Sequence, residues 1–162
     1  GELDPAMFGT VAGLNVPYIM MHMRGTPQTM QQHTGYTDMM EEIMLYFASK
    51  VRELRLLGVN DIILDPGFGF SKTVDQNYLL MNRLQEFGVF DLPLLVGISR
   101  KSMIYRFLGG TPADSLNGTT VLNTLALMNG ADILRVHDVK AAVEAVKLVL
   151  KTVNCQLSTV NC

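Results

Sequence analysis

Four short apolar segments alternate with longer amphipathic segments along the chain. The apolar segments cover residues 16–23, 61–65, 92–99 and 131–137. None of them alternates cleanly between polar and apolar residues, and near-continuous apolar strands are typical of parallel sheets that are buried on both faces. The pattern therefore predicts four buried parallel strands.

The segments between these strands have a hydrophobic period near 3.6 residues, which is typical of helices. In the clearest one, over about residues 38–57, Asp38 can cap the start with Glu41 three residues on, and Gly58 can end the helix. Further helices are predicted over residues 4–13, 75–87, 112–129 and 139–150, with a short helical turn after Arg100. One helix followed by four strand–helix units indicates an α/β fold with right-handed crossovers.

The ends of the chain carry little chemistry. The string TVNC occurs at 152–155 and again at 159–162, and we interpret residues 152–162 as a frayed tail beyond a domain over residues 1–151. Both cysteines, Cys155 and Cys162, lie in this tail, so no disulfide framework is expected. The first 13 residues lack the basic start and the apolar stretch of a signal peptide, and a reducing cytoplasm is the expected location.

Composition narrows the class of protein further. Of the 162 residues, 48% are hydrophobic, and the 13 basic and 15 acidic side chains give a formal charge of −2. This content suffices for one buried domain. Without a basic surplus, neither nucleic acid nor an anionic membrane surface is an expected partner. No apolar run reaches the roughly 18 residues of a membrane span.

Groups suited to ligand binding follow every predicted strand. The four strings are MHMRG at 21–25, DPGFGF at 65–70, GISRKS at 97–102 and RVHD at 135–138. In parallel α/β folds, ligands bind beyond the carboxyl ends of the strands. The pattern predicts one shared site, whereas motifs for dinucleotides, nucleotide phosphates, serine hydrolases or zinc proteases are missing from the sequence.

Asp65 is the sharpest candidate because it closes an apolar strand and is expected to be partly buried. It either caps the loop that follows or accepts two donors from the edge of a flat heterocycle. Charge-assisted hydrogen bonds contribute roughly 1.5–3 kcal/mol each, so two of them would select a guanidine-like edge. In the next loop, Phe68 and Phe70 are either core aromatics or a cover for a bound ring, while Gly67 and Gly69 permit a tight turn.

Three cationic side chains and two histidines complete the candidate set. Lys101 is either a ligand contact or a solvated charge, and Arg100 beside it can point away into a structural ion pair. Arg135 and His137 are two residues apart on a predicted strand and should face the same side, as an anion site or as a salt-bridged pair in the core. His22, between two methionines, is expected to be a hydrogen-bonded core residue.

The strand ends, taken in order, resemble the motifs of the dihydropteroate synthase family. The matching strings are MHMRGTPQTMQ (21–31), DPGFGFSKTVDQN (65–77), VGISRKSMI (96–104) and LRVHDV (134–139). Corrinoid-dependent methyltetrahydrofolate methyltransferases share a pterin-binding barrel but lack the SRK string. The resemblance implies a folate-pathway transferase that joins 6-hydroxymethyl-7,8-dihydropterin diphosphate to 4-aminobenzoate, giving 7,8-dihydropteroate and diphosphate.

The resemblance also implies residue roles. Asp65 would bind the amino-pyrimidine edge of the pterin and Lys101 would stack on its ring. The remaining roles would be a pterin pocket lined by Met21 and Gly97, an aminobenzoate site made by Ser99 and Phe70, and a diphosphate site made by Arg135 and His137, with Arg135 also near the pterin. Lys101, Arg135 and His137 would be the catalytic groups, and Mg²⁺ would be the cofactor.

The family fold is a TIM-type (β/α)₈ barrel, which typically needs roughly 250 residues. This chain shows four units, and we interpret them as strands five to eight. The family's magnesium ligand lies in an N-x-T-P-D-S-F motif on the first strand, and this sequence does not contain it, so no metal ligand is assigned here. We expect the chain alone to be inactive, and to be a partial sequence or to self-associate as a homodimer. The alternative is a non-catalytic pterin-binding or structural half-barrel.

Overall fold

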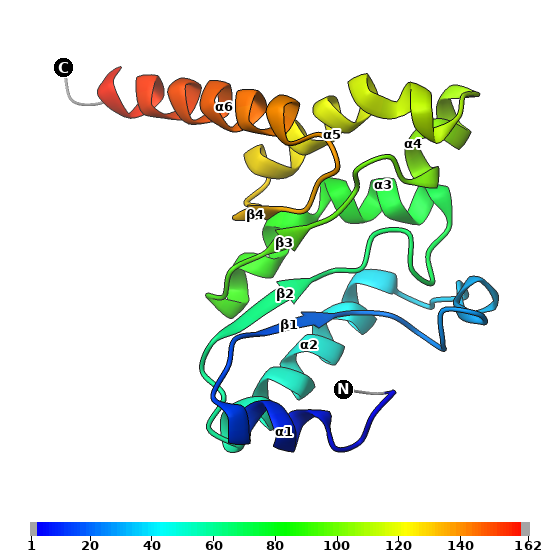
Figure 1. Cartoon of the computed structure of the whole chain (residues 1–162), viewed down its shortest axis with the longest axis vertical. Helices are drawn as coiled ribbons and strands as arrows, with labels where there is room; N and C mark the ends of the chain where they lie inside the picture. Colours follow the sequence, from blue (N-terminus) through cyan, green and yellow to red (C-terminus); the bar gives the residue numbers. More distant parts are fainter. Residues whose placement is uncertain (1–2, 160–162) are drawn as a thin grey trace.

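The computed structural model describes the backbone of residues 3–159 and the side chains of residues 3–153. Helix α1 (Met7–Leu14) precedes four strand–helix units (Figure 1). The strands are β1 (Tyr18–Met21), β2 (Ile62–Asp65), β3 (Leu95–Val96) and β4 (Ile133–Leu134). The α-helices are α2 (Met39–Leu56), α3 (Val74–Asn82), α4 (Ser102–Leu108), α5 (Leu116–Met128) and α6 (Val139–Thr159), and the 3₁₀ helices are η1 (Met30–Gln32), η2 (Leu84–Phe90) and η3 (Pro112–Ser115).

All strand pairs are parallel, as the sequence predicts. β1 pairs with β2, with Met21 opposite Asp65, and β3 pairs with β4. A single parallel bridge from Leu64 to Leu94 joins the two pairs, and the Leu64 amide donates to the Pro93 carbonyl at 2.9 Å. The strands therefore lie side by side in chain order, and their carboxyl ends share one rim (Figure 1).

The hydrogen-bonded strands are shorter than the apolar segments that predict them. Ile98 is fully buried although the β3 ladder ends at Val96. Hydrophobic pattern reports burial, and burial continues into the loops beyond β2 and β3. Strand existence and direction are thus confirmed, and β2 ends at Asp65 as predicted, whereas the other three strands end before the predicted residue.

The helices follow the predictions with two local differences. Asp38 caps α2 by accepting from the Glu41 amide, as expected. The segment over 75–87 divides instead into α3, which begins in a capping box of Thr73 and Gln76, and the tighter η2. The segment over 112–129 likewise begins as η3 before α5.

Helix α6 runs further than the sequence predicts. It continues to Thr159, beyond residue 152 where we expected the tail to begin. No glycine or proline follows Leu150 to end the helix. Residues 160–162, the rest of the predicted tail, lie outside the described residues. No helix in the described part of the chain has the length and apolar character needed to cross a bilayer.

The core lies between the sheet and the helices on one side of it. Met20 and Leu64 are opposite each other in the β1–β2 register and are 1% and 0% exposed. They share this core with fully buried residues of α2 such as Ile43 and Phe47. Ile19 points to the other face of β1 and is 48% exposed. That face is the one that would line the interior of a closed barrel.

Within residues 3–159, β1 has a strand partner on one side only, and so does β4. Two open edges with about three unmade backbone pairs each forgo roughly 6 kcal/mol, at about 1 kcal/mol per hydrogen bond. That is comparable with the whole stability of a small domain, about 5–15 kcal/mol. The fold therefore favours association that covers the edges.

We predict that light scattering on the chain will show a dimer or a larger assembly. Ile19→Lys should weaken this assembly, because it places a charge on the exposed face of β1. The matched control is Leu56→Lys, on the outer surface of α2, where the side chain is already 79% exposed. A monomer that melts cooperatively at low concentration would contradict the prediction.

Candidate functional site

Asp65 ends β2 at the shared rim and is 2% exposed. Its Oδ1 accepts a 2.9 Å hydrogen bond from the Gly67 amide, so it does cap the following loop. Its Oδ2 is buried and accepts no hydrogen bond from the described residues. The nearest cation is the Arg135 guanidinium, whose Nη2 lies 3.4 Å from Oδ2. One carboxylate oxygen is therefore fixed and the other is available to a donor.

The charge of this carboxylate is set by opposing effects. Burial raises the pKa of Asp65. The Gly67 amide and the positive charges of Arg135, Lys101 and Lys72 lower it. The ionised form, which accepts hydrogen bonds, thus depends on the three cations that surround it.

Lys101 reaches the same place from the loop after β3. Its Nζ donates to the Phe68 carbonyl and lies 4.6 Å from the centroid of the Phe70 ring. Burial lowers the pKa of Lys101 to about 8, although the charge of Asp65 opposes this shift. Lys101 is therefore directed at the rim. Phe68 is fully buried in the core, whereas Phe70 is half-buried beneath the lysine.

Arg135 follows β4 and crosses over Gly97, which follows β3. A Cβ atom at position 97 would lie 2.8 Å from Nη2 of Arg135, so only glycine leaves room for the guanidinium. The Arg135 side chain remains 55% exposed. The structure thus brings Asp65, Lys101 and Arg135 together, from three neighbouring strands.

His137 has a different partner from Arg135. The backbone amide of His137 donates to Oγ of Ser99 at 3.2 Å, and its Nδ1 lies 3.0 Å from the same oxygen. Ser99 is 4% exposed and His137 is exposed. The prediction that Arg135 and His137 share one strand is wrong, because β4 ends at Leu134. Both still lie beyond the same strand, and neither is a core residue.

Two other predicted residues lie at the edges of the rim. Met21 ends β1 opposite Asp65, and its Cγ would be 3.5 Å from a Cβ at Gly67. Its side chain also lines a hollow beside Met7, on the outer side of β1. Arg100 points away from the rim, as expected, into a two-bond ion pair with Asp138 at 2.8 Å.

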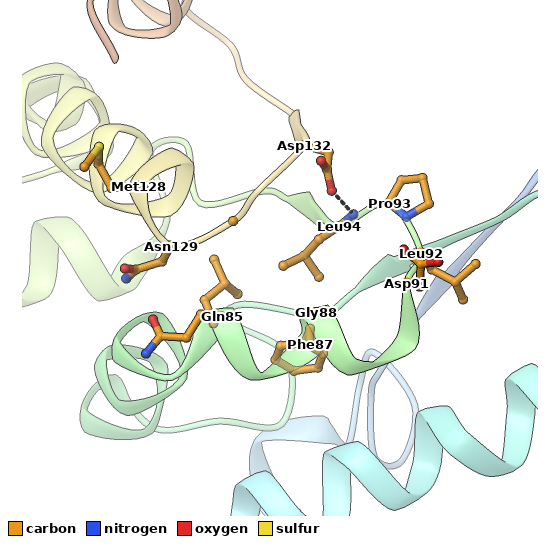
Figure 2. A pocket seen from close by; sticks show the side chains of 12 residues that line it. Gln85, Phe87, Gly88, Asp91, Leu92, Pro93, Leu94, Met128, Asn129 and Asp132 are labelled. Carbon is orange, nitrogen blue, oxygen red and sulfur yellow. Dashed lines mark hydrogen bonds between the residues drawn. The ribbon is translucent and has the colours of Figure 1, made fainter. Parts of the chain in front are cut away.

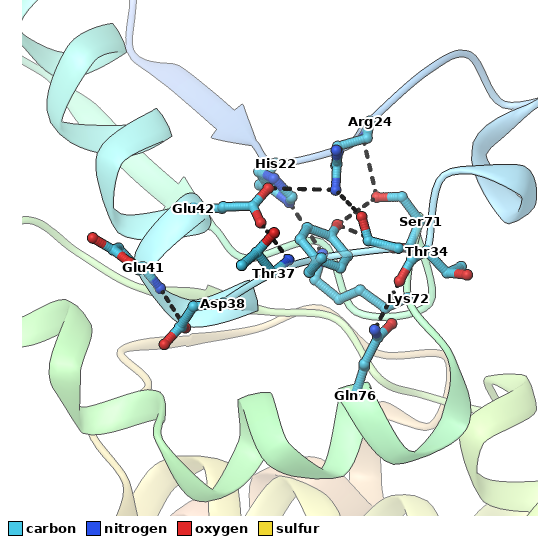
Figure 3. A network of polar contacts seen from close by, with 12 residues as sticks. His22, Arg24, Thr34, Thr37, Asp38, Glu41, Glu42, Ser71, Lys72 and Gln76 are labelled. Carbon is cyan, nitrogen blue, oxygen red and sulfur yellow. Dashed lines mark hydrogen bonds and ion pairs between the residues drawn. The ribbon is translucent and has the colours of Figure 1, made fainter.

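Figure 3 shows a polar network beside the rim that the sequence analysis did not single out. It joins the loop after β1 to the loop after β2. Arg24 contacts Glu42 at 3.4 Å and donates its amide to Ser71, and Gln76 donates to the Thr34 carbonyl. Lys72, also missed, is 3% exposed and contacts His22 at 3.1 Å. His22 is the hydrogen-bonded core residue that the sequence predicts.

The groove in Figure 2 belongs to the opposite end of the strands. Its volume is about 550 Å³ and it is lined by residues that precede β3 and β4, including Gln85, Leu94 and Asp132. Asp132 accepts from the Leu94 amide at 2.8 Å, a bond that fixes the start of both strands. In barrel folds this end serves stability, whereas ligands bind at the carboxyl ends.

The described side chains offer no group of three or more His, Cys, Asp or Glu placed to hold a metal ion. The rim is instead rich in cations around one carboxylate. Such a set suits an anionic or hydrogen-bond-donating organic ligand.

Comparisons with known proteins agree with this geometry. Residues 1–137 match the family described as "Pterin binding enzyme". Dihydropteroate synthase of Escherichia coli strain K12 is 43% identical over 148 residues, which are 90% of this chain and 52% of the relative. The Synechocystis synthase is also 43% identical, with 51% of its length covered. The chain spans about half the length of these curated relatives.

Solved structures give the same result. The Yersinia pestis dihydropteroate synthase in a sulfonamide drug complex superposes with a TM-score of 0.90 at 40% identity, covering 93% of this chain and 56% of that one. The Thermus thermophilus synthase in complex with 6HMPPP gives 0.87 at 36% identity, covering 91% and 60%.

A parallel sheet with cations and a buried carboxylate at its carboxyl rim defines an α/β protein, and its structural neighbours are of the TIM-barrel type. The chain belongs to the pterin-binding enzyme family, and its resemblance to dihydropteroate synthase is confirmed.

The tight fit of Gly67 yields a stability prediction. Gly67 has φ +72°, and a Cβ there would lie 2.0 Å from the His22 carbonyl oxygen. Gly67→Ala should lower the free energy of unfolding by about 2–3 kcal/mol or more. The backbone at His22 or at residue 67 must shift to avoid the clash, and alanine at this position must keep a strained positive φ. Gly9→Ala is the control: it meets open space within α1, so it should raise helix stability by up to about 1 kcal/mol. Equal effects of the two changes in urea unfolding would contradict this account.

Proposed function

We propose that this chain supplies strands five to eight, one half of the barrel, of a dihydropteroate synthase. The reaction condenses 6-hydroxymethyl-7,8-dihydropterin diphosphate with 4-aminobenzoate to give 7,8-dihydropteroate and diphosphate. The observation that carries the proposal is Asp65, a buried carboxylate with one unbonded oxygen among three cations. An amino-pyrimidine edge presents the paired N–H donors that such a carboxylate accepts.

In the proposed reaction, the amine nitrogen of aminobenzoate forms a C–N bond to the pterin methylene carbon as the C–O bond to diphosphate breaks. The leaving diphosphate takes the electron pair, and the amine loses a proton. Positive charge develops on the pterin, where Asp65 disperses it. Negative charge develops on diphosphate, where Arg135 and His137 are placed to stabilise it.

Lys101 would lie on the pterin ring, where its positive charge also stabilises the ionised form of Asp65. Met21 and Gly97 would lie beside the ring. Ser99 would bind the aminobenzoate carboxylate, and half-buried Phe70 would lie against the aminobenzoate ring. Sulfonamides would compete for that subsite. These side chains form no covalent bonds to the substrate. Positioning and fixed charges therefore supply the rate acceleration.

Magnesium is an expectation from the family resemblance alone. The described residues offer no group of three or more His, Cys, Asp or Glu that could hold it. No step above depends on it. We also infer that the chain works in the cytoplasm, and that it acts as part of an assembly that covers its open edges.

The second candidate is a half-barrel that binds pterin without turnover. It is favoured by the gathering at one rim of Asp65, Lys101 and Arg135, the groups that the resemblance assigns to the pterin. Release of diphosphate from the pterin substrate in the presence of 4-aminobenzoate separates the two candidates. Pterin binding without that release would favour the second.

We predict that Asp65→Asn will lower the affinity for a pterin at least tenfold, because the amide is uncharged and presents a donor toward the pterin's own donors. The matched control is Asp61→Asn, just before the start of β2, where the side chain is exposed. Titration calorimetry with a pterin analogue measures both. Unchanged affinity in Asp65→Asn would show that no pocket forms around this residue.

A further inference from the structure

Lys72 is a buried cation without a role in the reaction above. It lies between β2 and α3 and is 3% exposed. Its Nζ is 3.1 Å from each of three acceptors: the Gly67 carbonyl, the Phe70 carbonyl and Nδ1 of His22. An ammonium group carries three N–H donors, one for each acceptor, whereas a neutral amine has only two. The geometry therefore matches the charged form.

The histidine partner is built to accept from this lysine. Burial, together with the charges of Lys72 and Arg24, lowers the pKa of His22 to about 3, so the ring is neutral. The Tyr46 ring meets it edge-on at a centroid distance of 5.0 Å. The backbone amide of His22 donates to the Asp65 carbonyl at 2.9 Å. Lys72 thus connects the loop after β2 to the end of β1.

The two carbonyls close a turn around the ammonium group. The Phe70 amide donates to the Gly67 carbonyl at 3.1 Å, and the Gly69 amide donates to Oδ1 of Asn77 at 2.7 Å. This same loop supplies the amide that fixes Asp65 and the ring beneath Lys101. A charge at its centre therefore acts on both pterin contacts.

The charged groups that face Lys72 are Asp65 and Lys101. Burial lowers the pKa of Lys72 to about 7; the charge of Lys101 contributes to this shift and the charge of Asp65 opposes it. Conversely, the charge of Lys72 lowers the pKa of Asp65. The lysine and the carboxylate support each other's ionised form.

We propose that Lys72 is a positioning residue for the proposed pterin site: its ammonium group holds the loop over residues 67–70, and with it the Gly67 amide that binds Asp65, and its charge favours the ionised form of that carboxylate. This inference rests on the proposed function, since Asp65 is the group that would meet the pterin. It assigns Lys72 no contact with substrate.

The test compares Lys72→Met with Lys50→Met in the 162-residue chain. Lys50 is the matched control, because it pairs with Glu53 on α2, away from the rim. The Asp65 carboxylate is followed by ¹³C NMR over a pH titration, its signal being assigned by its loss in Asp65→Asn. In Lys72→Met we expect the Asp65 midpoint to move to higher pH, and pterin affinity at neutral pH to fall about tenfold.

The midpoint distinguishes positioning by charge from mere loosening of the loop. An Asp65 midpoint that stays at its original pH in Lys72→Met overturns the proposal, even if affinity falls equally at every pH. If the original chain binds no pterin while the midpoint still moves, the proposed function is refuted and the coupling of Lys72 to Asp65 stands.

A second measurement applies if Lys72→Met does not fold, as judged by circular dichroism. Coupling between two sites is reciprocal. The Lys72 amine, followed by ¹⁵N NMR in lysine-labelled chain, should therefore titrate at lower pH in Asp65→Asn than in the original chain. Titration at the same pH in both chains overturns the proposal.

Discussion

A buried carboxylate that must stay charged is the constraint on which the rim depends. Asp65 is 2% exposed, and an ion in such a place is unstable unless it is paired and hydrogen-bonded. Its stabilising groups come from every strand end: the Gly67 amide from its own loop, Lys101 from beyond β3 and Arg135 from beyond β4. The end of β1 fixes the Asp65 backbone through the His22 amide.

The same constraint explains two of the glycines. The Gly67 amide reaches the carboxylate because glycine, which has no Cβ atom, fits against the His22 carbonyl. Gly97 leaves room for the Arg135 side chain to cross β3 toward Asp65. Each glycine thus serves an electrostatic contact made by another residue. Parallel pairing in chain order is what places these contacts within reach of one another, because all four strands end at one rim.

The sequence predicts this gathering well and its inner support poorly. An apolar strand that ends in a charged residue is visible in a one-dimensional pattern, and so Asp65, Lys101 and Arg135 could be chosen beforehand. Lys72 follows a loop, with no strand pattern around it, and its burial results from the turn that closes over it. The pairing of His137 with Ser99 depends on where the β4 ladder stops, and hydrophobic pattern does not report the end of a ladder.

The balance of charge at the rim indicates what it is suited to meet. One carboxylate and three cations (−1 + 3 = +2) face one another there. Burial lowers the pKa of Lys72 to about 7 and that of Lys101 to about 8; the charge of Lys101 adds to the first shift, and the charge of Arg135 adds to the second. Arg135, with its side chain 55% exposed, is the most exposed of the three cations. An anionic ligand beside Arg135 would relieve this excess, while a neutral ring with N–H donors would satisfy the free oxygen of Asp65. The pterin diphosphate of the proposed function carries both features in one molecule.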